Sequence, residues 1–145
     1  MDYWHGLDSA NRTATLEELL AHGLEVGAYL QGIGWSHRGL VEVAHRYGYK
    51  GFNVDSADNS LTPKSPHEAW AMVTRELEQG PLLVSVFAGL DPYRGGGHIV
   101  VLTGVHDELT FFNDPEEMSA REGYKTVALE AFLRAFKRRY IVIRP

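Results

Sequence analysis

The sequence of 145 residues contains no cysteine. This absence excludes disulfide bonds, thiolate metal sites and, most consequentially, a cysteine nucleophile. Long apolar runs are also missing, since none approaches the ~20 residues that a membrane span requires. The N-terminal residues lack the basic segment followed by an apolar one that marks a signal peptide. We therefore expect a cytoplasmic protein that makes no contact with a membrane.

Positive charge is in short supply. The chain has 14 Lys and Arg against 19 Asp and Glu, which gives a formal net charge of −5. No basic stripe is available to neutralise phosphates, so nucleic-acid binding is not expected. The one basic cluster, Lys137-Arg138-Arg139, is predicted at the end of a helix, where cations complement the helix dipole.

Hydrophobic residues make up 44% of the chain, which is enough for a core, and the length suits a single domain over residues 1–145. Residues 1–14 show no periodicity and are interpreted as an irregular lead-in. Apolar spacing and capping signals predict helices over 16–22, between Ser36 and Gly48, between Ser65 and Gly80, and over 129–136. Strands are predicted at 51–55, 82–87, 99–105, 109–112, 124–127 and 140–143. Helices early and strands late favour an α+β fold with a largely antiparallel sheet.

The segment 95–115 carries the strongest chemical signal. Three glycines lead into His98, which opens an apolar strand; a short turn at 106–108 reverses the chain into a second strand, which ends at Asn113-Asp114-Pro115. Antiparallel pairing would place His98 and Asp114 at the same end of the hairpin. An imidazole beside a carboxylate is the base and orienter of a nucleophilic triad. The plainer alternative is a structural hydrogen bond and an Asx turn.

Other sites are weakly supported. The remaining histidines form no His-x-x-x-His or Glu-x-x-His pair suited to a metal, so no metal is expected unless folding adds a third ligand to His98 and Asp114. The glycine run precedes a strand rather than a helix, which argues against a nucleotide site, and no cofactor is expected. Trp35 and His37 flank Ser36, and this segment either anchors the following helix or forms the wall of a substrate cleft.

Several segments match one family pattern. They are His98-Ile-Val-Val-Leu-Thr-Gly104, Asp114-Pro115 after the next strand, Thr126 to Phe132 with Ile141 to Pro145, and Gly34 to Leu40. Together they resemble the C39-like cysteine peptidases, which have a papain-like fold. The resemblance spans roughly residues 15–145. It implies an antiparallel sheet flanked by helices, with His98 as general base and Asp114 as its orienter. Gly97, Trp35 and His37 are expected to line the cleft.

One half of the family pattern is missing. C39-like peptidases begin with an oxyanion-hole glutamine and a Cys-Gly-Pro-x-Ser element that opens the core helix, and neither occurs here. Ser9, Thr13 and Thr15 lie upstream of His98, but none is followed by Gly-Pro. The N-terminal core helix is therefore expected to be missing or replaced, and whether the chain is an enzyme is left open.

Three hypotheses follow. The first is a truncated peptidase or a pseudo-peptidase that binds a peptide or protein ligand. The second is a non-catalytic interaction module in which His98 and Asp114 are structural, and the third is a hydrolase that uses serine or metal-bound water. Loss of the core helix would expose a sheet face, and this predicts cover by residues 1–14, a homodimer or a partner chain. The residues expected on that face are Val84, Val86, Val100, Leu102, Phe111 and Ile141.

Overall fold

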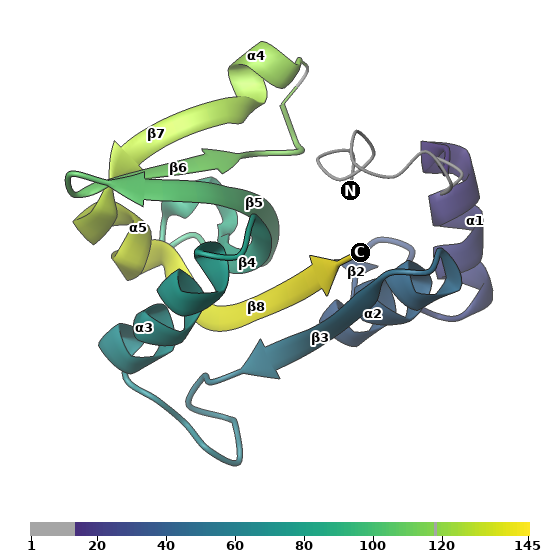
Figure 1. The fold of residues 1–145 in the computed structure, drawn as a ribbon, viewed down its shortest axis with the longest axis horizontal. Helices are drawn as coiled ribbons and strands as arrows, with labels where there is room; N and C mark the ends of the chain where they lie inside the picture. Colours follow the sequence, from purple (N-terminus) through teal and green to yellow (C-terminus); the bar gives the residue numbers. More distant parts are fainter. Residues whose placement is uncertain (1–13, 118) are drawn as a thin grey trace. The chain divides into compact units, whose positions relative to one another are not determined.

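The computed structural model describes residues 14–117 and 119–145 (Figure 1). The chain divides into two compact units, one of Val54–Val142 and one of the residues up to Asn53 with Ile143–Pro145. The single domain remains a prediction. The lead-in over residues 1–13 and the candidate nucleophiles Ser9 and Thr13 lie outside the described residues. No helix among the described residues has both the length and the apolar character needed to cross a bilayer.

The unit that includes the residues up to Asn53 contains helix α1 (Leu16–Glu25), which has the predicted capping box. The Thr15 hydroxyl accepts the Glu18 amide proton, and the Glu18 carboxylate accepts that of Thr15. The helix is longer than predicted, because Gly23 does not end it. Gly23 is buried inside α1, and a Cβ there would lie 2.4 Å from the Trp35 ring, so this glycine makes room for the indole.

Strands β1 (Tyr29–Leu30) and β2 (Gly34–Trp35) form a small antiparallel ribbon in a glycine-rich segment. Helix α2 (His37–Arg46) follows with Ser36 as its N-cap, as predicted. Gly48 adopts φ +85°, the left-handed conformation of a glycine beyond a helix C-terminus.

The main sheet has six strands in the order β3-β8-β4-β5-β6-β7. The strands from β4 to β7 are successive antiparallel neighbours, in agreement with the predicted largely antiparallel sheet, and β3 is an edge strand. The β5–β6 turn has Asp107 and Glu108 at φ +47° and +62°, the conformation of a two-residue type I′ hairpin. The strands are β3 (Lys50–Asp55), β4 (Leu82–Phe87), β5 (Gly97–His106), β6 (Leu109–Asn113), β7 (Tyr124–Ala128) and β8 (Phe136–Arg144).

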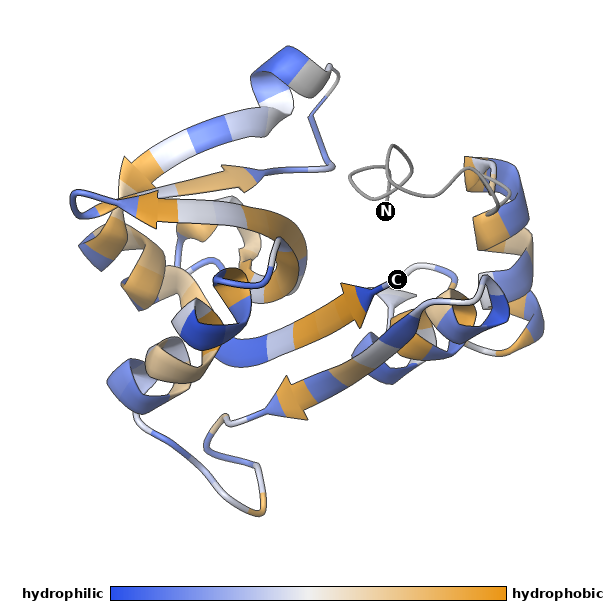
Figure 2. Cartoon of the chain, in the orientation of Figure 1, coloured by the Kyte–Doolittle hydropathy of each residue, from blue (hydrophilic) through white to orange (hydrophobic). Residues whose placement is uncertain are grey.

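In the Val54–Val142 unit, helices contribute hydrophobic side chains to the same core as the sheet. Helix α3 (Pro66–Leu77) has the predicted Ser65 capping box with proline at its first position. Helix α5 (Leu129–Ala135) agrees with the prediction within one residue, while the short α4 (Ala120–Gly123) and the 3₁₀ turn η2 (Ala88–Leu90) were not predicted. Hydrophobic residues of α3 and α5 join those of the sheet in one buried cluster. The hydrophobic stretches of these helices and strands are orange in Figure 2.

The sequence predicted that one face of the sheet would be exposed without a core helix. This prediction is wrong for most of the residues expected on that face. Five of the six are at most 1% exposed, and only Phe111 is half-buried. Four of the five belong to the cluster with α3 and α5, because the register puts their side chains on the face that these helices contact. The residues are Val84, Val86, Val100, Leu102 and Ile141, of which Ile141 lies outside this cluster. At these positions there is no exposed apolar face that would require a dimer or a covering segment.

The basic cluster at 137–139 does not end a helix, since α5 stops at Ala135 and these residues lie in β8. Arg138 adopts φ +57° and donates to Asp58 and to the Lys64 carbonyl. Lys137 Nζ lies 5.1 Å from the centre of the Phe87 ring. The cations bind the loop before α3 and an aromatic ring, so the helix-dipole interpretation is wrong.

Candidate functional site

His98 lies near the start of β5, on the core-facing side of the sheet. It pairs with Val86 of β4, and its neighbour two positions on, Val100, is only 1% exposed. Because side chains alternate along a strand, His98 shares this face with the buried valines. Its side chain is 10% exposed, so packing encloses most of the imidazole without burying it completely.

Asp114 follows the last residue of β6 and approaches the imidazole from the adjacent strand. Its amide donates to the Gly123 carbonyl at 2.8 Å, which holds the backbone where β6 ends. The carboxylate Oδ1 lies 2.6 Å from His98 Nε2, and its side chain is 15% exposed. A carboxylate accepts hydrogen bonds, so Nε2–H donates and the lone pair of neutral His98 is at Nδ1. The structure thus brings together the two residues that the sequence paired.

Two further donors hold the Asp114 carboxylate. Oδ1 also accepts the Glu116 amide proton at 3.1 Å, an Asx turn across Pro115, and Oδ2 accepts from Lys125 Nζ at 3.2 Å. Burial raises the pKa of Asp114, but the hydrogen bonds from His98, the Glu116 amide and Lys125 outweigh burial and hold the pKa below its usual range. Asp114 is therefore an anion at neutral pH, as an orienter of histidine must be.

Lys125 and Glu116 are the site residues that sequence reasoning missed. Lys125 lies on β7 opposite Phe112, and it binds Glu117 as well as Asp114. Hydrogen bonding to Glu117 raises the pKa of Lys125, burial lowers it, and the bond to Asp114 raises it further. Strand register could have identified Lys125, because Phe112 lies two residues before Asp114 on the facing strand.

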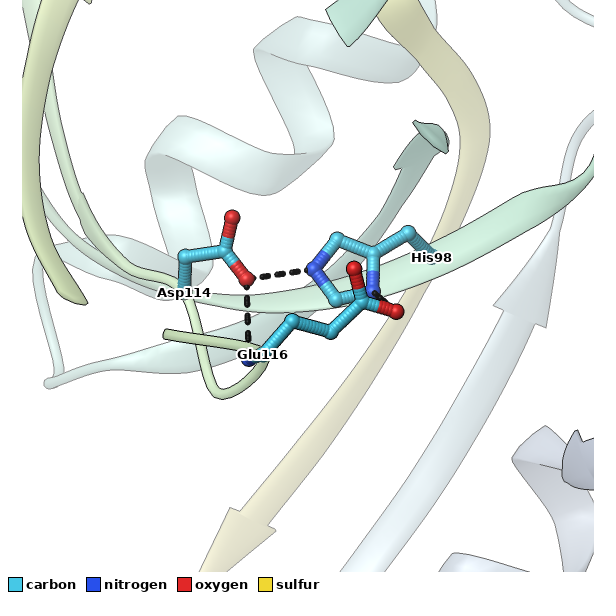
Figure 3. Close-up of side chains that lie close together, drawn as sticks. All are labelled: His98, Asp114 and Glu116. Carbon is cyan, nitrogen blue, oxygen red and sulfur yellow. Dashed lines mark hydrogen bonds and ion pairs between the residues drawn. The ribbon is translucent and has the colours of Figure 1, made fainter. Parts of the chain in front are cut away.

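Glu116 faces the second ring nitrogen of His98. Its Oε1 lies 3.4 Å from Nδ1, so the imidazole is positioned between two carboxylates (Figure 3). Ligand atoms of His98, Asp114 and Glu116 all lie within 4.8 Å of one another. The Glu116 side chain is 74% exposed, and its only sequence signal was its position two residues after Asp114.

A cavity of about 110 Å³ lies beside the His98–Asp114 pair. Its walls are mostly apolar, and none of its described lining residues carries a hydroxyl or a thiol. The arrangement can therefore orient a histidine and accept a proton at Nδ1, but its described lining supplies no hydroxyl or thiol nucleophile. The residues are Val86, Gly89, Leu90, His98, Val100, Phe112, Asp114, Lys125 and Val127.

The predicted cleft residues have different surroundings. Gly97 is exposed, and a Cβ there would lie 3.3 Å from Lys137 Nζ. Trp35 and His37 belong to the other unit, where the Trp35 ring packs against Gly23 and, edge-on, against Tyr29. This packing fits an anchoring role for Trp35. A role of these three residues in a cleft remains a prediction.

Comparison with known proteins supports the fold that the hairpin suggested. Residues 25–136 match the protein family described as papain-like cysteine protease AvrRpt2. No functionally curated protein gives a significant match.

Solved structures agree with the family match. The peptidase domain of Streptococcus ComA, a bi-functional ABC transporter involved in a quorum-sensing pathway, aligns with a TM-score of 0.62 at 15% identity and covers 92% of this chain and 80% of that one. A putative C39-like peptidase from Bacillus anthracis gives 0.54 at 23% identity, over 79% of this chain and 62% of that one. A double-glycine-motif protease from an AMS/PCAT transporter, solved with its leader peptide, gives 0.53 at 18% identity, over 83% and 67%. The predicted α+β, C39-like fold is confirmed.

Proposed function

We propose that this chain, which belongs to the family described as papain-like cysteine protease AvrRpt2, is a pseudo-peptidase. It would bind peptides without cleaving them. The observation that carries the proposal is a base-and-orienter pair in a chain with no cysteine. His98 Nε2 and Asp114 Oδ1 are 2.6 Å apart, and no thiol exists to use the lone pair at Nδ1.

Retention of the pair favours binding over a purely vestigial site. The cavity places the polar side chains of His98, Asp114 and Lys125 among otherwise apolar walls, the mixture of groups that ligand sites use. The double-glycine-motif protease with a similar fold was solved with a leader peptide, which makes a peptide the ligand class to test first. Such a peptide would place a backbone or side-chain donor on Nδ1.

Binding and cleavage can be measured on the same sample. Fluorescein-labelled leader peptides ending in Gly-Gly, and a randomised peptide library, would be titrated against the full chain by anisotropy and then examined by mass spectrometry. We expect saturable binding and intact peptide, with His98→Ala weakening binding several-fold. His106→Ala is the matched control, because His106 also pairs with an aspartate but is 79% exposed. Absence of binding, or binding that is equal in both variants, would overturn the proposal.

Cleavage would point to a different enzyme. Peptide fragments that disappear with His98→Ala would mean a hydroxyl or water nucleophile, the hydrolase hypothesis. The truncated-peptidase alternative has its own test, which is an in-frame Gln…Cys-Gly-Pro segment in the coding sequence upstream of Met1. That finding would replace the pseudo-peptidase with a cysteine peptidase that includes this chain.

The number of hydrogen bonds to the Asp114 carboxylate favours the alternative of a non-catalytic interaction module. Three donors bind its carboxylate, a number that a purely structural clamp would also explain. In that case His98→Ala would lower the free energy of unfolding by ~1 kcal/mol or more and leave peptide binding unchanged. Measuring both quantities on one variant separates the two functions.

A further inference from the structure

The second nitrogen of His98 and the Glu116 carboxylate have the geometry of a metal site. The Nδ1–Oε1 distance is 3.4 Å. Two ligands on a tetrahedral Zn²⁺, with bonds of about 2.0–2.2 Å, are separated by about 3.4 Å. This distance would let one ion contact both atoms, and the Glu116 side chain is exposed enough to adjust its orientation.

The far side of the ring already has the partner that metal-binding histidines use. A ligating histidine almost always donates its other ring N–H to a carboxylate, which fixes the tautomer and strengthens the ligand. Here Nε2–H donates to Asp114 Oδ1. This leaves the lone pair at Nδ1, on the side of Glu116.

The same carboxylate also positions the second ligand. Asp114 Oδ1 accepts the Glu116 amide proton at 3.1 Å, and Pro115 between them restricts the backbone. One atom therefore orients the imidazole and anchors the turn that carries Glu116. The imidazole is oriented before any ion arrives, which lowers the entropic cost of binding, and the turn holds the backbone of Glu116 beside it.

Local charge also favours a cation. Lys125 binds Asp114 and Glu117, so its charge is shared with two carboxylates other than Glu116. The three carboxylates of Asp114, Glu116 and Glu117 outnumber the Lys125 ammonium, which binds two of them. Imidazole and carboxylate together suit Zn²⁺ and similar divalent transition metals better than Mg²⁺ or Ca²⁺.

We propose that His98 Nδ1 and Glu116 bind Zn²⁺, with Asp114 as the orienting carboxylate behind the histidine. Two protein ligands leave the other positions to water or to a donor from a bound molecule. The site is open and reversible, unlike a four-ligand structural zinc site. Zinc at Nδ1 occupies the atom that a nucleophile or peptide donor would otherwise use. This inference does not depend on peptide binding.

Titration of the full chain with ZnCl₂ tests the proposal, by calorimetry and by histidine side-chain ¹H–¹⁵N spectra. We expect the His98 Nδ1 resonance to shift first. Glu116→Gln should weaken zinc binding at His98 about tenfold or more, and Asp114→Asn by about 10–100-fold. Glu117→Gln is the neighbouring control and should stay within twofold, with His106→Asn controlling for zinc held by the exposed His106–Asp107 pair.

Clear results would contradict the site. If Glu116→Gln binds zinc as tightly as the wild type, or if His98 Nδ1 does not shift while other histidines do, zinc binds elsewhere and the proposal fails. Absence of any binding at millimolar zinc also overturns it. Glu116 is exposed, so Glu116→Gln should keep its fold, which circular dichroism would verify. Loss of peptide binding in a separate assay would concern the pseudo-peptidase function and not this site.

Discussion

Asp114 connects every polar element of the site. Its carboxylate accepts from His98, from the Glu116 amide and from Lys125, and its backbone amide binds Gly123. Hydrogen bonds to charged groups are stronger than neutral ones, and a partner left buried without its bond carries a desolvation penalty. A single side chain therefore sets both the chemistry of His98 and the end of the hairpin.

We expect Asp114→Ala to lower the free energy of unfolding by about 2–3 kcal/mol, because His98 and Lys125 each lose a charged partner. The matched control is Asp91→Ala. Asp91 forms the same kind of Asx turn, in an Asp-Pro-x sequence with the Tyr93 amide at 2.9 Å, but it is exposed. Urea unfolding at pH 7 should show a loss of about 1 kcal/mol or less for the control. Equal losses would mean that only the turn matters.

Helix α1 illustrates how packing between elements overrides helix propensity. Alanine normally stabilises a helix interior relative to glycine by about 1 kcal/mol. Gly23 occupies such a position, but the Trp35 ring lies where its Cβ would be. Glycine is required there by the contact with β2, not by the helix.

Gly23→Ala should therefore destabilise the protein, by about 1–3 kcal/mol for an overpacked contact, against the propensity gain. Ala21→Gly, at an exposed position of the same helix, should cost about 1 kcal/mol through propensity alone. Thermal unfolding followed by circular dichroism gives both values. A stabilising Gly23→Ala would mean that the indole moves away at little cost.

The stability that Glu68 contributes at the N-terminus of α3 should depend on pH. The hydrogen bond from the Ser65 amide, followed by that from the Ser65 hydroxyl, holds the pKa of Glu68 below its usual range. A carboxyl with a lowered pKa in the folded state stabilises the fold above its unfolded pKa, about 4.3, and loses that contribution as the pH falls through the folded value. The melting temperature of the wild type should exceed that of Glu68→Gln at pH 7, and this gap in melting temperature should disappear at acidic pH. A gap of constant size from pH 7 to pH 3 would contradict this.

At the scale of the molecule, aromatic packing ties the helices of the Val54–Val142 unit to its sheet. The Phe132 ring of α5 lies 5.7 Å from Trp70 of α3 and 5.5 Å from Phe112 of β6, centre to centre. Phe112 also lines the cavity beside His98. The same cluster therefore closes the core and shapes one wall of the site.

Phe132→Ala should lower the free energy of unfolding by about 3–5 kcal/mol, because Phe132 is fully buried and the cavity left behind cannot collapse without moving both neighbours. Leu133→Ala, on the same helix and only partly buried, should cost clearly less. Equilibrium unfolding in guanidinium chloride would compare the two variants. Similar losses would mean that α5 contributes mainly through its helix and not through Phe132.

Features that depend on neighbouring residues could be predicted from the sequence. The capping boxes at Thr15 and Ser65, the α2 boundaries, and the pairing of His98 with Asp114 follow from local signals, because caps, turns and a short hairpin involve residues close in the chain. Local patterns could not reveal which sheet face the helices cover, where the basic residues 137–139 bind, or that Lys125 and Glu116 join the His98–Asp114 pair. The first two outcomes and the place of Lys125 depend on strand register and helix packing, which bring distant residues together. Glu116 is close to Asp114 in the chain, but it faces His98 only because β5 and β6 pair.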